Sequence, residues 1–285
     1  MNQIKLIECP RDAMQGIKTF IPTQIKIEYI TKLLAVGFDT LDFGSFVSPK
    51  AIPQMKDTHE VIQKIGPLKG STKLLAIVAN ERGAEDACKY EEIDYLGYPF
   101  SVSETFQIRN TNASIQESIS RLEAINTLSL KHGKKMVVYL SMAFGNPYGD
   151  PWNAEIISQY IDQLSNKGII YFALSDTIGV AEPESIKYLF ETILPQWKQL
   201  EIGAHFHTTP NTWEEKMSSA WEAGCRKFDG AIRGFGGCPM AKDSLTGNMP
   251  TENILNFFSG KAEPLQVNMN AFNDAMSYSS LVFSE

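Results

Sequence analysis

The chain has 285 residues, of which 43% are hydrophobic and 21% are charged, so it is long enough to fold around a substantial core. Its formal net charge of -7 argues against nucleic acid or an anionic membrane as the main partner, although a local basic patch could still bind a phosphorylated ligand. No apolar run approaches the roughly 20 residues of a membrane span, and the four cysteines lack the spacing of a disulfide framework or a thiolate zinc site.

The N-terminus begins MNQIKLIECP and enters an apolar, strand-like segment at once. It has neither the apolar core of a signal peptide nor the Arg- and Ser-rich amphipathic helix of an organelle transit peptide. We therefore expect a cytoplasmic protein.

One pattern recurs along the chain: an amphipathic helix ends in glycine and a short apolar run follows. Glycine suits this position because it adopts the left-handed conformation that turns a helix back into a strand. Thr23 is expected to N-cap the first long helix, and Ser114 with Glu117 predicts a capping box for a later one. The glycines that end the four clearest helices are Gly37, Gly133, Gly168 and Gly224.

Strands that alternate with helices in this way indicate a parallel sheet. The eight predicted strands are Lys5–Glu8, Thr40–Phe43, Lys73–Val78, Glu92–Gly97, Lys135–Ser141, Ile169–Ser175, Glu201–His207 and Lys227–Ile232.

Eight strand–helix units in about 250 residues predict a TIM (β/α)8 barrel. We expect one domain, with the barrel over residues 3–262 and a short C-terminal appendage over residues 263–285. An open doubly wound sheet is the alternative. It is less favoured because CPRDAMQG, and not a G-x-G-x-x-G phosphate turn, follows the first strand.

The stretch GAHFHTTPNT contains two of the four histidines, His205 and His207. Side chains at i and i+2 of a strand point to the same face, roughly 6 to 7 Å apart along the chain. The two imidazoles could therefore bind one metal ion. The alternative is a pair of core or rim histidines with ordinary hydrogen-bond partners.

In a TIM barrel the active site lies at the C-terminal ends of the strands. Asp12 follows the first strand, and Asn248 lies in the segment after the eighth. Together with His205 and His207 they supply two nitrogens and two oxygens, which favours Mg²⁺ or Mn²⁺ and leaves Zn²⁺ as an alternative.

Other polar residues are expected at the same rim. Arg11 could stabilise an enolate or bind a carboxylate, or it could form a simple salt bridge. Cys238, in the Gly-rich stretch GFGGCPMA, is either a reactive group on a mobile loop or a buried inert thiol. Asp42 is expected to partner Arg11, with metal binding and helix capping as alternatives. Asp176 is expected to be structural, or to orient a histidine.

Five motifs in this order resemble the 3-hydroxy-3-methylglutaryl-CoA (HMG-CoA) lyase family of aldolase-like TIM-barrel metallolyases. The resemblance spans nearly the whole chain. The block SFVSPKAIPQM is the most specific of these motifs, because related isopropylmalate and homocitrate synthases lack it. The motifs are ECPRDAMQGIK, SFVSPKAIPQM, LSDTIGVAEP, HFH and GFGGCPMA with the later GN.

The resemblance implies cleavage of an acyl-CoA substrate, HMG-CoA, to acetyl-CoA and acetoacetate, by a homodimer. It implies that Arg11 stabilises the enolate, that Asp12 removes the hydroxyl proton, and that Cys238 protonates the carbanion. The divalent cation would be bound by the residues that match the family's ligands, namely Asp12, His205, His207 and Asn248.

The chain also departs from the family pattern. Asp42 stands where the family has glutamate, and Thr208 where it usually has aspartate. Cys9 and Ala13 replace two glycines beside the Arg-Asp pair, and the spacing from the reactive cysteine to Asn248 is one residue longer than expected. These differences leave two alternatives open: a Claisen-type synthase that joins an acyl-CoA to a 2-oxo acid, and a non-catalytic barrel that binds acyl-CoA.

Overall fold

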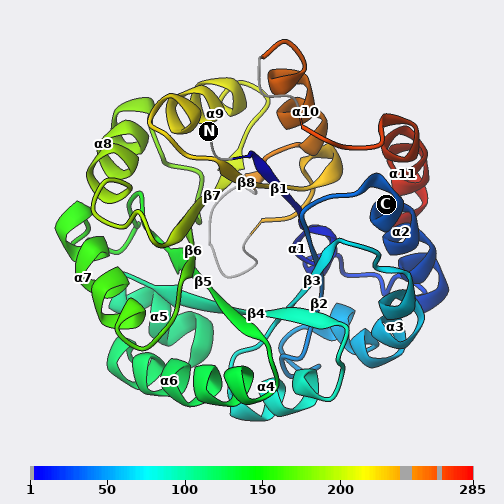
Figure 1. Cartoon of the computed structure of the whole chain (residues 1–285), viewed down its shortest axis with the longest axis horizontal. Helices are drawn as coiled ribbons and strands as arrows, with labels where there is room; N and C mark the ends of the chain where they lie inside the picture. Colours follow the sequence, from blue (N-terminus) through cyan, green and yellow to red (C-terminus); the bar gives the residue numbers. More distant parts are fainter. Residues whose placement is uncertain (1–2, 238–245, 262–264, 285) are drawn as a thin grey trace.

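Eight parallel strands form a closed ring in the computed structural model of the chain (Figure 1). Each strand pairs with the next along the chain, and the last strand pairs with the first. The predicted TIM barrel is therefore confirmed. The structure describes residues 3–237, 246–261 and 265–284. The barrel strands are β1 (Lys5–Glu8), β2 (Thr40–Ser45), β3 (Lys73–Ile77), β4 (Ile93–Ser101), β5 (Lys135–Ser141), β6 (Tyr171–Asp176), β7 (Glu201–Thr208) and β8 (Lys227–Gly230).

All eight predicted strands are present, and β1 and β5 have the predicted bounds. The largest difference is in β4, which continues to Ser101. Pro99 does not end this strand, since it lies within the ladder, opposite Tyr139 of β5. The strand β8 ends earlier than predicted, since Ile232 begins a 3-10 turn, η3 (Ile232–Gly234).

Helices surround the barrel (Figure 1). The four glycines predicted to end helices all have left-handed φ angles, between 68° and 96°. The Ser114–Glu117 capping box is present. The predicted role of Thr23 was wrong: Pro22 is the N-cap residue, and Thr23 is the first residue of the helix. The helices are α1 (Pro10–Gln15), α2 (Thr23–Val36), α3 (Thr58–Ile65), α4 (Glu81–Cys88), α5 (Glu104–Thr111), α6 (Ile115–Lys131), α7 (Ala154–Ser165), α8 (Pro183–Ile193), α9 (Trp213–Glu222), α10 (Thr251–Ser259) and α11 (Met269–Val282), with short 3-10 turns η1 (Pro53–Met55) and η2 (Gly66–Leu68).

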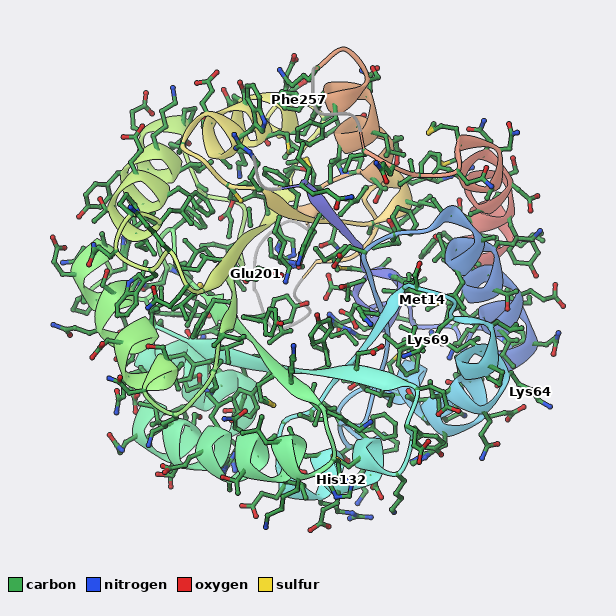
Figure 2. The ribbon with its side chains drawn as sticks, in the orientation of Figure 1. Met14, Lys64, Lys69, His132, Glu201 and Phe257 are labelled. Atoms are coloured by element: carbon green, nitrogen blue, oxygen red, sulfur yellow. The ribbon has the colours of Figure 1, made fainter. Side chains whose placement is uncertain are left out.

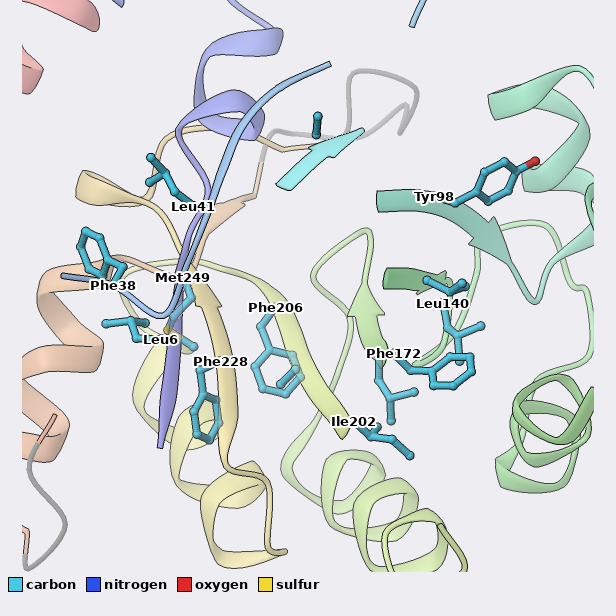
Figure 3. Close-up of a cluster of buried hydrophobic side chains, with 14 of the residues drawn as sticks. Leu6, Phe38, Leu41, Tyr98, Leu140, Phe172, Ile202, Phe206, Phe228 and Met249 are labelled. Carbon is cyan, nitrogen blue, oxygen red and sulfur yellow. The ribbon is translucent and has the colours of Figure 1, made fainter. Parts of the chain in front are cut away.

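The apolar core has two parts because strand side chains alternate between the two faces of the barrel wall. The larger part fills the space between barrel and helices, and Phe172, Phe206 and Phe228 belong to it (Figure 3). The smaller part lies inside the barrel and includes Leu75 and Val137. Charged and polar side chains such as Lys64 and His132 lie on the outer ring of helices (Figure 2).

The last helix, α11, lies against α2 at the outside of the ring (Figure 1). Asn268 donates its backbone N–H to the carbonyl of Val36 at 2.9 Å, and Lys32 forms an ion pair with Asp274 at 2.6 Å. The predicted division into barrel and appendage stays a proposal. None of the helices in the described part of the chain has the length and apolar character needed to cross a bilayer.

Glu8, the last residue of β1, joins the barrel to the segments that follow β8. Its carboxylate accepts hydrogen bonds from the backbone N–H of Ile232 at 2.9 Å and from the hydroxyl of Thr251 at 2.5 Å. Burial raises the pKa of Glu8 to about 8, although both hydrogen bonds act in the opposite direction. The folded chain therefore binds this proton more tightly than the unfolded chain does.

We expect the loss of the Glu8 proton to make the protein less stable as pH rises. Because the folded pKa of Glu8 is above the ordinary value of 4.5, its contribution is complete below pH 4.5 and is lost as pH rises to about 8. Within that window the free energy of unfolding should fall by up to roughly 1.4 kcal/mol per pH unit from this group. Glu8→Gln, which keeps an acceptor for Ile232, should remove that part of the slope. Urea denaturation of both proteins at several pH values measures it, and parallel pH profiles would contradict the raised pKa.

Candidate active site

The local sequence at the end of β1 places Arg11 and Asp12 together at the mouth of the barrel. Pro10 ends the strand and occupies the first position of α1, where its missing N–H costs nothing. The chain therefore turns into a helix immediately, and both neighbouring side chains reach the same buried region. A continuing strand would have sent them to opposite faces.

His205 and His207 lie in β7 and point to the same side of it. Their ring centroids are 5.4 Å apart. Between them, Phe206 points to the other side and packs on Phe144, with ring centroids 5.5 Å apart. The alternation expected from the H-x-H spacing therefore places both imidazoles at the barrel interior.

Each histidine uses one ring nitrogen for a hydrogen bond inside the protein. His205 Nδ1 lies 3.0 Å from Oδ2 of Asp229, and His207 Nδ1 lies 2.8 Å from the backbone carbonyl of Thr177. A carbonyl only accepts, so His207 carries its proton on Nδ1, and its Nε2 has a free lone pair. His207 Nε2 is buried and has no hydrogen-bond partner within the described residues.

Asp12, His205 and His207 can together bind one metal ion. One ligand atom from each lies within 4.8 Å of the others. Burial opposes ionisation of Asp12, but the charge of Arg11 and the two imidazoles bring its pKa below the ordinary value. Burial, and then the neighbouring His205, lower the pKa of His207, so this ring is neutral as a ligand must be. The unpartnered Nε2 of His207 and this donor set fit a divalent cation.

A second possible group of ligands lies deeper and shares one histidine with the first. It consists of Cys9, His205 and Asp229. Burial raises the pKa of Cys9 well above its ordinary value, and the nearby carboxylates raise it further. The thiol therefore stays protonated, and a thiol in that state is a poor ligand.

Arg11 is fixed by carboxylates on two sides. Its Nε and one terminal nitrogen donate to Asp42, the latter at 2.5 Å, and its other terminal nitrogen donates to Asp12 at 3.0 Å. The side chain of Gln15 joins this network, accepting from Arg11 at 2.9 Å and donating to Asp12 at 2.7 Å. Burial raises the pKa of Asp42 to about 6, although Arg11 acts in the opposite direction. Asp42 thus contacts Arg11, as expected from the sequence, and orients its guanidinium.

Asn248 reaches the site through a short strand, β9 (Gly247–Asn248), which pairs antiparallel with β7. Its side-chain amide donates to Oδ2 of Asp12 at 2.7 Å and to the backbone carbonyl of Phe235 at 2.9 Å. Thr208, which stands where the family has aspartate, donates its hydroxyl to the carbonyl of Asn248 at 3.3 Å. Cys238 lies outside the described residues.

Asp176 pairs with a lysine and not with a histidine. Its carboxylate pairs with Lys216 at 2.6 Å, and the same ammonium donates to the backbone carbonyl of His207 at 3.0 Å. Asp176 therefore supports the backbone of β7 and does not orient an imidazole. The carboxylate next to an imidazole is Asp229, which the sequence analysis did not single out. In the sequence, the available signal was that Asp229 follows apolar Phe228 in a predicted strand. The structure places Asp229 in register with His205.

A cavity of about 480 Å³ opens at this end of the barrel. Asp12, His205 and His207 line it, together with Phe106 and Arg109 from the helix α5. The guanidinium of Arg109 lies 4.7 Å from the ring centroid of Tyr148. It has no carboxylate partner among the residues described. The cavity therefore combines the candidate metal ligands with an available positive charge.

The HMGL-like family matches residues 3–281. The chain belongs to this family. Among relatives, it is 36% identical over 246 residues to hydroxymethylglutaryl-CoA lyase YngG of Bacillus subtilis, covering 86% of this chain and 81% of that one. It is 31% identical to a 3-hydroxy-3-isohexenylglutaryl-CoA/hydroxymethylglutaryl-CoA lyase of Pseudomonas aeruginosa, covering 96% and 91%. Among solved structures, an HMG-CoA lyase from Acinetobacter baumannii in complex with coenzyme A and 3-methylmalate superposes with a TM-score of 0.89, at 27% identity, covering 98% and 91%.

We expect Asp229→Asn in this HMGL-like protein to weaken Mn²⁺ binding by about tenfold or more, because the carboxylate that orients His205 and increases its basicity is lost. Titration calorimetry with Mn²⁺ measures the effect. Asp94→Asn is the matched control, since Asp94 is paired with Lys69 near the start of β4, at the opposite end of the barrel. Equal dissociation constants for the two variants would show that His205 does not depend on Asp229.

Proposed function

We propose that the chain is a divalent-metal-dependent carbon–carbon lyase that cleaves HMG-CoA to acetyl-CoA and acetoacetate. The observation that carries the proposal is the buried, unpartnered Nε2 of His207, which lies with His205 and Asp12 beside the guanidinium of Arg11. Membership of the HMGL-like family and relatives named as HMG-CoA lyases support the choice of substrate.

The proposed reaction needs a base, an electron-accepting group and an acid. The base removes the proton of the tertiary hydroxyl at C3, and the bond between C3 and C2 breaks as the C3 carbonyl of acetoacetate forms. The electron pair of that bond passes to C2 and is delocalised into the thioester as an enolate. An acid then protonates C2 to give acetyl-CoA.

The proposed cation ligands are Asp12, His205, His207 and Asn248, and the two imidazoles with oxygen donors favour Mg²⁺ or Mn²⁺, with Zn²⁺ as the alternative. When bound, such a cation supplies positive charge that favours loss of the hydroxyl proton. Asp12 is ionised at neutral pH because of the charges around it, so its carboxylate can accept that proton.

Arg11 supplies a second positive charge, for the enolate oxygen. Asp42 binds its guanidinium through two nitrogens, so the arginine is oriented before the substrate binds. The aspartate side chain is one methylene shorter than the family's glutamate, but it still reaches Arg11. We therefore propose that Asp42 orients Arg11 and that the positive charge of Arg11 stabilises the enolate.

The acyl-CoA would occupy the cavity of about 480 Å³. The phosphates of coenzyme A are anionic, and Arg109 in the cavity lining offers a guanidinium without a carboxylate partner among the described residues. A homodimer, expected from the family resemblance, and a cytoplasmic location belong to the proposal.

The first experiment is an assay of the purified protein with HMG-CoA, with and without Mg²⁺ or Mn²⁺, that follows acetoacetate. We expect acetoacetate only with metal. A protein that binds metal but is silent with HMG-CoA would favour the Claisen-type synthase, and release of free coenzyme A from acetyl-CoA plus a 2-oxo acid would identify that activity. Binding of acyl-CoA without either reaction would leave the non-catalytic barrel.

His207→Ala is expected to abolish metal-dependent formation of acetoacetate, because it removes the one ring nitrogen in the site that is buried and unpartnered. Mn²⁺ titration and the acetoacetate assay measure the loss. His59→Ala is the control, since that exposed imidazole bonds to Tyr90. If His207→Ala kept metal-dependent turnover, His207 would be excluded as a ligand.

Cys238→Ala is expected to bind Mn²⁺ and acyl-CoA normally but to lose roughly 10² to 10⁴ in turnover, which is the usual contribution of a general acid. Steady-state kinetics with HMG-CoA separate the two effects. The buried Cys88 in α4 offers a control substitution, Cys88→Ala. Near-normal turnover of the Cys238 variant would refute a role for this thiol in proton transfer.

A further inference from the structure

The C-terminal end of α11 contacts the segment that follows β8. Phe283, the residue after the helix, stacks on Phe235, with ring centroids 4.3 Å apart and ring planes 12° apart. On the same helix, the backbone carbonyl of Met276 accepts a hydrogen bond from a terminal nitrogen of Arg233 at 3.4 Å. Two independent contacts therefore join the last helix to residues 233–235, which follow β8.

The helix α11 is itself anchored, so it can act as a fixed support. On its α2 side, Tyr278 donates its hydroxyl to Glu28 at 2.6 Å, and the ion pair between Lys32 and Asp274 lies at 2.6 Å. The ring of Phe283 also packs edge-on against Tyr29 of α2, with centroids 5.9 Å apart. A ring held in this way restricts the movement of anything stacked on it.

The segment beside Phe283 is also in direct contact with the candidate metal site. The backbone carbonyl of Phe235 accepts the side-chain amide of Asn248, which donates to Asp12 as well. Gly236 leaves no free space there: a Cβ on it would lie 2.4 Å from the amide nitrogen of Asn248 and 3.0 Å from the carbonyl oxygen of Asp12. A shift of this backbone would therefore displace the amide.

The backbones of Gly234 and Gly247 are packed just as closely. A Cβ on Gly247 would lie 2.0 Å from the carbonyl oxygen of Gly234. Gly234 has a left-handed φ of 67°, which lets the chain turn at this point. Segments in such contact move together, because close-packed interiors transmit displacement.

We propose that α11 is a positioning element for the active site: the stack of Phe283 on Phe235 fixes the backbone that orients Asn248 toward Asp12. Its effect on metal binding rests on the proposed function, but the contact itself does not. Phe283 would be a positioning residue that touches neither metal nor substrate. The predicted C-terminal appendage would therefore support the site through α11.

The test compares Phe283→Ala with Phe283→Tyr, which keeps the ring, and with Leu281→Ala, which removes a side chain that is 58% exposed on the same helix. Hydrogen exchange of the metal-free proteins is the first measurement. We expect amides at 231–237 and 246–250 to exchange about threefold to tenfold faster in Phe283→Ala, in line with the usual strength of an aromatic pair, and to be unchanged in the other two. The amides of α6, on the opposite side of the ring from α11 (Figure 1), should exchange normally in all three.

The second measurement is the Mn²⁺ dissociation constant, which should rise by about threefold to tenfold in Phe283→Ala only. Adding Phe235→Ala to that variant should have little further effect, because both substitutions remove the same contact. Unchanged exchange at 231–237 and 246–250, equally faster exchange throughout α6, or an unchanged dissociation constant would each overturn the inference. If the unsubstituted protein bound no Mn²⁺, the proposed metal site would fail, while the exchange pattern would still decide whether Phe283 positions this segment.

Discussion

The site depends on the closure of the barrel, in which β8 pairs with β1 on one side and with β7 on the other. This pairing brings Asp12 beside His205 and His207, although about two thirds of the chain lies between them. In an open sheet the first and seventh strands need not meet. The same closure places Asp229 of β8 in register with His205. The ligand group is therefore a consequence of parallel strands that complete a ring, and it cannot form before the ring does.

Within this site, almost every buried charge has a partner. Arg11 is paired with Asp42 and Asp12, the imidazole of His205 with Asp229, and the carboxylate of Asp12 also with Asn248. Burying these groups unpaired would cost several kcal/mol each, so the pairing offsets the cost of placing these charges in the interior. Among the polar side-chain atoms of the described site residues, the Nε2 of His207 is the one that is buried and left without a hydrogen bond. This nitrogen is the atom to which the proposed cation would bind.

Two of the departures from the family pattern are accommodated by local contacts. Asp42 reaches Arg11 despite its shorter side chain, and the hydroxyl of Thr208 bonds to the β9 backbone. Cys9 is fully buried below the candidate ligands, in a place where glycine would leave more space. None of these substitutions removes a proposed ligand. They alter the supports of the site, and the supports also include α11 through the ring of Phe283.

The sequence by itself determined the features that depend on short-range geometry. The helix-ending glycines, the capping box at Ser114 and the same-face spacing of the two histidines all follow from neighbouring residues, and so does the number of strand–helix units. The tertiary structure alone decided which hydrogen-bond partner each carboxylate meets: His205 for Asp229, Lys216 for Asp176, and Asn248 for Asp12. These partners lie on different strands and segments, so their pairing depends on the register of the closed barrel and on packing. No local pattern encodes that register, because it is set by the contacts of all eight strands together.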